Sequence, residues 1–341
     1  LKATVMYSQD GHPETNFRIV PVSPNAASLG TFGMIPTDNY VGQANLTIPI
    51  YEIDLDGKKF PIALSYHTDG TRVAQEATWI GLGWTLQAGG CVVRQVQGTD
   101  DFAARGCYNL TDAPWLTNPR FEVTDQNLEK YMGYFKGDYD AEPDMFYFNA
   151  GGHSGSMYFD VLKNNRQLNA VPTIQTQEKV VKMVYNTSNK TWTMTDLEGY
   201  VYSFSTKEIT YYFLNTIDFF QTDITRSHIF PYYNEPQIVT AWMLDSVTSP
   251  NGGKITFSYK KESIFTPIST TEDVISLSKI VNGQLSSQSP QYFTNKFNYN
   301  YSYSKIEQWT LSAITFEGGK VEFGTTDRED IESAETGKKV Q

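Results

Sequence analysis

The stretch WMLDSVTSPNGGKITF, from Trp242 to Phe257, carries the pattern that decides the fold. Apolar and polar residues alternate on both sides of a Pro-Asn-Gly-Gly turn, which predicts a two-stranded β-hairpin. The same pattern returns in WTLSAITFEGGKVEF, from Trp309 to Phe323, and a looser copy, WTMTDLEGYVYSF, begins at Trp192. In the units that begin at Trp242 and Trp309 we expect Trp and Leu to point inward on the first strand, and an aliphatic residue and Phe on the second.

Two more strands are predicted closer to the N-terminus. ANLTIPIYEIDL (44–55) and KKFPIALSYHT (58–68) both alternate with period two, and the Asp-Gly pair between them is typical of a tight hairpin turn. The best helical candidate begins at Thr124 or Asp125 and ends near Phe135. The predicted fold is therefore all-β, with antiparallel hairpins in sandwich-like layers and at most one or two short helices.

The chain length of 341 residues allows two domains. We predict an N-terminal β region over residues 1–165 and a second β region of repeated hairpins over 166–341. Residues 1–44 are rich in Pro, Gly, Asn and Ser and predict extended chain and turns. A Ser-rich segment ending near Pro290 predicts a strand followed by a loop, and the charged C-terminal tail is expected to fray.

Composition excludes some classes of partner. The formal net charge of −11 disfavours nucleic acid and anionic lipid surfaces. No apolar run reaches the ~18 residues of a membrane-spanning helix, so none is expected. The two cysteines, Cys91 and Cys107, are either bridged or two buried free thiols, and the sequence leaves both readings open.

The glycine-rich stretch ATWIGLGWTLQAGGCVV (77–93) has two interpretations, a phosphate-binding loop or a structural turn. A dinucleotide-binding loop needs a third glycine where Leu86 stands and a helix after it, whereas a strand-like segment follows here. We therefore expect no cofactor, and we expect the glycines and tryptophans of this stretch and of the repeated hairpins to be structural. These residues are Trp79, Gly81, Gly83, Trp84, Gly89, Gly90, Trp242, Gly252, Gly253, Trp309, Gly318 and Gly319.

Candidate catalytic and metal-binding residues are few. Ser154 lies in GHSGS, close to a nucleophile elbow, but an elbow needs a helix after the serine and MYFDV predicts a strand. The four histidines are scattered and show no metal-ligand spacing. Alternating carboxylates in KGDYDAEPD are either a solvated acidic loop or a Ca²⁺ site, because calcium prefers oxygen ligands. The candidate ligands are Asp138, Asp140, Glu142 and Asp144.

A family resemblance rests on an ordered series of motifs between residues 21 and 330. The series is SPNAASLGTFGMIP, GQANLTIPIYEI, FPIALSYHTDGTRV, ATWIGLGWTLQAGGCVVRQVQG, EPDMFYFNAGGHSGSMYFD and AWMLDSVTSPNGGKITFSY. It resembles the N-terminal region of RHS/YD-repeat proteins, especially the surface proteins of Bacteroidetes-type bacteria. It is also similar to the N-terminal region of plasmid virulence and insecticidal toxin B components.

The resemblance implies a non-catalytic N-terminal scaffold of a larger secreted or cell-surface protein, in a toxin-delivery or cell-contact system. Its expected partner is a downstream YD-repeat shell of the same polypeptide, with surface proteins or glycans as further partners. A surface glycan-binding β-module is the first alternative, motivated by the aromatic content, and a hydrolase using Ser154 is the second. Any enzymatic activity is expected beyond Gln341. The ligand or cargo and the oligomeric state stay open.

Overall fold

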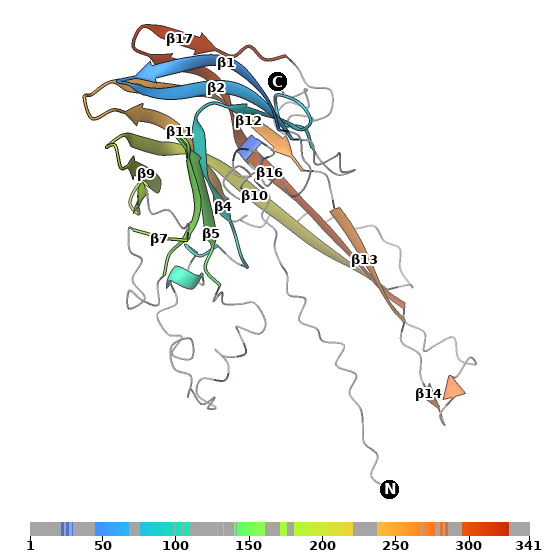
Figure 1. The fold of residues 1–341 in the computed structure, drawn as a ribbon. Coiled ribbons are helices and arrows are strands. Elements are labelled where there is room, and N and C mark those ends of the chain that lie inside the picture. The colour runs from blue at the N-terminus through green and yellow to red at the C-terminus, as the bar shows by residue number, and fades with distance from the viewer. Residues whose placement is uncertain are drawn as a thin grey trace. The chain divides into compact units, whose positions relative to one another are not determined.

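A computed structural model defines the fold for a large part of the chain (Figure 1). The described residues are 22–23, 25–26, 29, 45–67, 76–98, 100–103, 106–109, 128, 132, 140, 142–160, 171–175, 181–220, 237–266, 269–276, 280–281, 284–285 and 295–326. They are mostly antiparallel strands, which confirms the predicted all-β class. The predicted helix near residues 124–135 lies outside the described residues except for Leu128 and Met132, which are helical.

The chain divides into two compact units. Unit 1 comprises Leu1–Glu208, Val239–Lys261 and Gln308–Thr325, and unit 2 comprises Ile209–Ile238, Glu262–Glu307 and Thr326–Gln341. The predicted boundary near residue 165 stays a prediction.

A three-stranded sheet in unit 1 has the order β1-β2-β3. Its strands are β1 (Asn45–Leu55), β2 (Lys58–His67) and β3 (Trp84–Gln87). The hairpin between β1 and β2 turns at Asp56 and Gly57, whose φ angles of 51° and 92° are the left-handed values that an Asp-Gly turn requires. The hairpin predicted from the sequence is therefore confirmed.

The larger sheet has twelve strands, ordered β7-β6-β5-β4-β11-β12-β16-β10-β9-β8, with β13 and β17 also paired to β16. In chain order its strands are β4 (Gly90–Gln95), β5 (Met145–Ala150), β6 (His153–Tyr158), β7 (Thr173–Ile174), β8 (Val181–Asn186), β9 (Thr191–Asp196), β10 (Val201–Phe220), β11 (Gln237–Thr248), β12 (Lys254–Phe265), β13 (Ser269–Ser276), β16 (Asn295–Phe316) and β17 (Gly319–Glu322). A short 3-10 helix, η1 (Cys107–Asn109), follows β4, and β14 (Ile280–Val281) pairs with β15 (Gln284–Leu285).

The three repeated hairpins form as predicted. Trp242 lies in the buried part of β11 and Phe257 lies on β12. The turn between them is closed by the hydrogen bond from Gly252 N to Ser249 O (3.1 Å). Trp309 lies on β16, which turns back into β17. The looser copy at Trp192 is the β9–β10 hairpin. The twofold alternation in the sequence was sufficient to place these turns, because each hairpin buries one face of its strands.

The core of unit 1 lies between the two sheets and is rich in aromatic rings. Trp192 is 1% exposed and stacks on Phe159 with ring centroids 5.6 Å apart, while its contact with Trp242 is edge-on at 6.1 Å. Phe146 packs edge-on against both Phe159 (5.5 Å) and Trp192 (5.3 Å). Aromatic pairs of this kind add to the stability gained from burial alone, so much of the aromatic content is used inside the protein.

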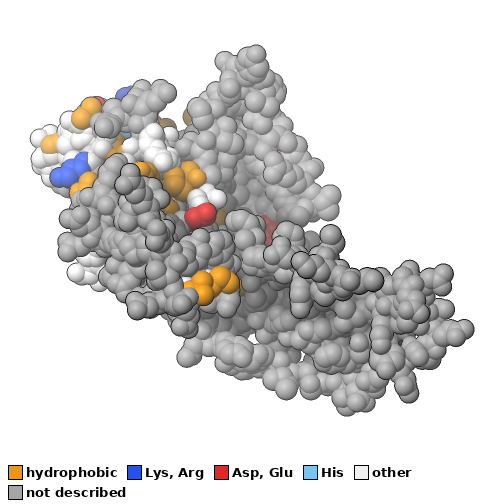
Figure 2. All heavy atoms as spheres, turned by 90° about the horizontal axis from the view of Figure 1, so that it is seen from below, with side chains coloured by type: hydrophobic (Ala, Val, Ile, Leu, Met, Phe, Trp, Pro, Cys, Tyr) orange, Lys and Arg blue, Asp and Glu red, His pale blue; other side chains and the backbone are white. Residues whose placement is uncertain are grey.

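Apolar surface is also present. Leu46, Ile48 and Ile50 on β1 are 43–51% exposed, beside an irregularity in the β1–β2 register between Pro49 and Tyr51. Figure 2 shows one face of the molecule, on which hydrophobic side chains of described residues lie at several separate places. Within the described part of the chain, no helix has the length and apolarity needed to cross a membrane.

Candidate functional site: a buried charge cluster and an inter-sheet groove

The glycine-rich stretch forms a turn that leads into β3. Gly81 N donates to Thr78 O (3.1 Å), Trp84 N donates to Gly81 O (3.2 Å), and Thr78 Oγ1 closes the turn by donating to Trp84 O (2.7 Å). Gly83 has a φ of 77°, a left-handed value that glycine adopts without strain. This part of the stretch is backbone architecture ahead of a strand, with no helix behind it.

The second glycine pair of the stretch joins β3 to β4. Gly89 has a φ of 92°. At Gly90 a Cβ atom would lie 2.7 Å from the Cβ of Ala150, so only glycine permits β4 and β5 to approach here. The two tryptophans are half-buried. Trp79 meets Phe323 edge-on at 6.0 Å, and Trp84 tilts against Tyr66 at 5.1 Å.

The tryptophans of two repeated hairpins, Trp242 and Trp309, each donate an indole hydrogen bond to a backbone carbonyl. The indole N–H of Trp242 donates to Lys190 O (2.8 Å), and that of Trp309 donates to Lys207 O (2.7 Å). Each bond ties its strand to another hairpin of the sheet. Of the glycines in these hairpins, Gly252 and Gly318 have positive φ in the turns, while Gly253 and Gly319 pack against Asp56 and Phe316.

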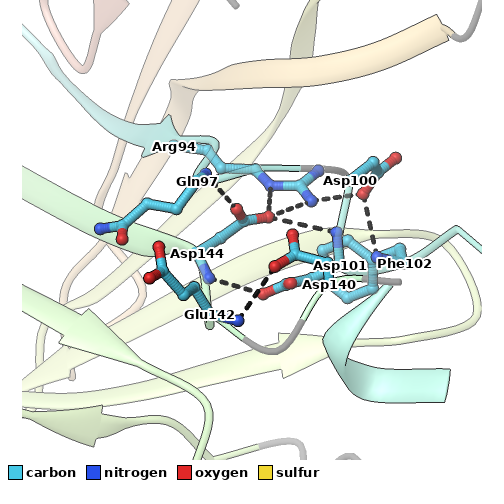
Figure 3. A network of polar contacts seen from close by, with 8 residues as sticks. All are labelled: Arg94, Gln97, Asp100, Asp101, Phe102, Asp140, Glu142 and Asp144. Atoms are coloured by element: carbon cyan, nitrogen blue, oxygen red, sulfur yellow. Dashed lines mark hydrogen bonds and ion pairs between the residues drawn. The ribbon is translucent and has the colours of Figure 1, made fainter. Parts of the chain in front are cut away.

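Arg94 is the centre of a buried charge cluster (Figure 3). Its guanidinium, 2% exposed, donates from Nε to Asp144 Oδ2 (2.8 Å) and from Nη2 to both Asp144 and Asp100. Asp144 also accepts from Gln97 N (2.7 Å), and its own N–H donates to Asp101 Oδ2 (2.6 Å). The cluster therefore fastens the segment after β4 to the start of β5.

Negative charge exceeds positive charge in this cluster. Asp100, Asp101, Asp140 and Asp144 surround the single guanidinium. Burial, followed by the charge of Asp144, raises the pKa of Asp101 to about 8, which favours a proton on this carboxyl group. Burial likewise raises the pKa of Asp144, against the opposing effect of Arg94. A proton on Asp101 thus removes part of the charge excess.

The predicted calcium ligands are only partly described. Asp138 lies outside the described residues. Asp140 is buried and accepts from Glu142 N (2.9 Å), and Asp144 points to Arg94. Among the described residues no group of three or more His, Cys, Asp or Glu side chains is arranged to hold a metal ion. The calcium site stays a prediction.

Ser154 lies on β6, two residues after the Gly151-Gly152 turn and within a strand. The adjacent His153 has its Nε2 3.8 Å from Asp196 Oδ2. Because neighbouring residues of a strand point to opposite faces, His153 and Ser154 do not form a Ser-His pair. The strand–turn–helix context of a nucleophile elbow is replaced here by a hairpin.

The two cysteines, Cys91 and Cys107, are both free and buried.

Glu208 is a buried carboxylate that sequence reasoning missed. It is fully buried and accepts hydrogen bonds from Ser23 N (2.7 Å), from the Ser23 hydroxyl and from Thr240 Oγ1 (3.2 Å). Burial raises its pKa to about 7, against the opposing effect of these donors. No local signal reveals it, since Ser23 lies 185 residues away in the sequence.

A groove of about 410 Å³ opens between the two sheets of unit 1. We call it the inter-sheet groove. The groove is lined by Phe60 and Ile62 of β2 and by Ile255 and Phe257 of β12, which are apolar. The Gly89-Gly90 turn and the Gly151-Gly152 turn also line it. Polar side chains that line it are Lys59, Gln87, Asn149 and Ser154.

Comparison with known proteins finds a distant likeness among solved structures. No protein-family model matches the chain, and no curated protein matches it. Among solved structures, the chain is similar to one described as "Crystal Structure of TcdB2-TccC3-Cdc42", with 13% identity and a TM-score of 0.30. The match covers 81% of this chain and 9% of that chain. A TM-score this low assigns neither fold nor function.

Proposed function

We propose that this chain is a non-catalytic scaffold, the N-terminal part of a larger secreted or cell-surface RHS/YD-repeat protein. The observation that supports this role most directly is the length of β10 and β16, with 20 and 22 residues. Strands in globular proteins usually have ~3–10 residues. Strands twice that length extend a sheet further than a single small core requires.

The pairing of these strands supports the same role. Within unit 2, β10 and β16 pair without interruption from Ile209↔Glu307 to Phe220↔Lys296. On its other side β16 pairs with β13, from Ser269↔Ser302 to Ser276↔Asn295. A three-stranded ribbon with regular register is a suitable base for further strands, because sheet edges pair readily with additional strands.

The described polar clusters are consistent with a structural role. The carboxylate of Asp144 accepts hydrogen bonds from Arg94 and Gln97. The carboxylate of Glu208 accepts hydrogen bonds from Ser23 and Thr240. These carboxylates join segments far apart in the chain. A toxin-delivery or cell-contact role, with the downstream repeats as the main partner, is part of the proposal.

The test is association with the remainder of the encoded polypeptide, expressed as a separate chain. Residues 1–341 should co-elute with it in size-exclusion chromatography as a one-to-one complex. Tyr299→Pro should abolish the complex. Tyr299 is paired with Ile217 on one side and Glu272 on the other, and proline has no backbone N–H to donate within a central strand. Tyr299→Phe is the matched control and should retain it. Two chains that elute separately at micromolar concentrations would overturn the proposal.

A further inference from the structure

We propose that the inter-sheet groove is a binding site for a neutral saccharide. This inference does not rest on the scaffold role, and either one can fail alone. The volume of about 410 Å³ is within the ~300–1,000 Å³ of small-molecule sites. The residues that argue for the ligand class all lie in unit 1 and among the described residues.

The charge of the lining points to a neutral ligand. Among the described residues that line the groove there is no Asp, Glu, Arg or His. Its one charged side chain, Lys59, has its Nζ 2.6 Å from Glu52 Oε1, so its charge is already balanced. A phosphate or carboxylate ligand would find no unpaired cation here, and a cationic ligand would find no carboxylate.

The polarity of the lining points to a ligand with many hydroxyl groups. Gln87 and Asn149 carry amide groups that both donate and accept, and Ser154 carries a hydroxyl that does the same. The Asn149 Nδ2 already donates to Leu29 O (3.1 Å), which fixes the orientation of this amide. Hydroxyl groups suit such a mixed set, because each also donates and accepts.

The apolar side of the groove complements a sugar ring. Phe60 is half-buried and offers its ring to the same groove as the amides, whereas Ile62 and Ile255 are 1% and 0% exposed and offer almost no surface to a ligand. A pyranose ring has C–H groups on its faces and hydroxyl groups at its edge, so one face can pack on the Phe60 ring while the edge contacts the amides. An acyl chain would leave the amides and the hydroxyl without partners, which is costly.

An extended peptide fits the groove less well than a saccharide. Peptides commonly bind by adding a strand to a free sheet edge. β2 is paired with both β1 and β3, and β5 is paired with both β4 and β6. The backbone hydrogen bonds of these two strands are therefore used within the sheets. Recognition in the groove must come from side chains and turn backbone, as is usual for small ligands.

The experiment uses the whole chain and four neutral disaccharides: maltose, cellobiose, lactose and N,N′-diacetylchitobiose. Binding is followed by saturation-transfer-difference NMR and by isothermal titration calorimetry. At least one of them should bind saturably. Ser154→Trp should abolish that binding by filling the mouth of the groove, and Gln87→Ala should weaken it about threefold to tenfold through loss of hydrogen bonds. Ser188→Trp, in an exposed turn away from the groove, is the matched control and should bind as the unaltered chain does.

Three outcomes would overturn the proposal. The first is that none of the four disaccharides saturates. The second is that Ser154→Trp binds as tightly as Ser188→Trp, which would place the sugar elsewhere. The third is that N-acetylneuraminic acid or an uncharged extended peptide binds more tightly than the disaccharide and displaces it. Circular dichroism of each variant separates loss of binding from loss of folding.

Discussion

At the residue scale, the most consequential groups are titratable side chains buried in unit 1. Glu208 has no cationic partner among its described contacts and relies on donors from Ser23 and Thr240. Arg94 has carboxylate partners on two sides. The two sites differ in kind, because one is a lone acid held by neutral donors and the other is an ion cluster. Each therefore has its own expected response to pH and mutation.

Replacement of Glu208 by Gln should reduce the pH dependence of stability. Its pKa is raised from the usual 4.5 to about 7, so its contribution is complete below pH 4.5 and is lost as pH rises through 7. The lost contribution is on the order of 3 kcal/mol. Urea unfolding at pH 5 and pH 8 should therefore show a smaller difference for Glu208→Gln than for the unaltered chain. Glu317→Gln, in an exposed turn, is the control, and an equal pH effect in both variants would contradict the prediction.

Removal of Arg94 should be among the most destabilising single substitutions. Arg94→Met leaves the fully buried Asp144 without its counter-charge, which typically costs about 3–5 kcal/mol. Arg94→Met/Asp144→Leu removes both charges and should recover a large part of the loss. Chemical denaturation of both variants measures this. A double variant no more stable than Arg94→Met would show that the ion pair is not the reason for the loss.

At the element scale, hairpins account for most of the architecture, and their turns have specific steric requirements. Gly151 and Gly252 both have positive φ in hairpin turns, yet their surroundings differ. At Gly252 no atom lies within 4 Å of an added Cβ, whereas at Gly151 the added Cβ would lie 2.6 Å from the ring of Tyr202. The same residue type thus meets a backbone requirement in one turn and a packing requirement in the other.

Comparison of Gly151→Ala with Gly252→Ala should separate these requirements. Gly252→Ala should cost about 1 kcal/mol, from backbone strain alone. Gly151→Ala should cost clearly more, because the Tyr202 ring must also move. Thermal unfolding gives the two differences in Tm, and Gly151→Ala/Tyr202→Ala tests whether removal of the ring relieves the second part. Equal losses in the two single variants would refute the packing argument.

The elements were predictable from the sequence where the determining interactions are local. The Asp56-Gly57 turn and the hairpins at Trp242 and Trp309 follow from alternation and turn residues within about sixteen positions. The polar clusters were not predictable, because Arg94 meets Asp144 across 50 residues and Ser23 meets Glu208 across 185. Local spacing grouped Asp144 with Asp140 and Glu142, whereas in the folded chain Asp144 points to an arginine on another strand. The inter-sheet groove depends on two sheets meeting, which no local pattern encodes.

At the scale of the whole molecule, the chain divides into two compact units of different size. The two main core clusters lie in unit 1 and include Trp192, Trp242 and Met243. Among the residues of unit 2 whose side chains the structure describes, the core cluster consists of Ile264 and Ile306. Unit 2 is also the shorter of the two units, and a shorter compact unit buries a smaller fraction of its surface.

Native-state hydrogen exchange should consequently show two levels of protection. A small compact unit buries less apolar surface than a large one and is expected to open at lower free energy. In low concentrations of urea, peptides from β13 and from residues 209–220 should exchange before peptides from β4, β5 and β11, as measured by mass spectrometry. Tyr299→Pro should accelerate exchange in the β10–β16–β13 ribbon and leave β4 and β5 unchanged, since it interrupts only the ribbon's ladder. A single urea concentration at which all these strands lose protection together would mean that the ribbon folds as one cooperative structure with the core of unit 1.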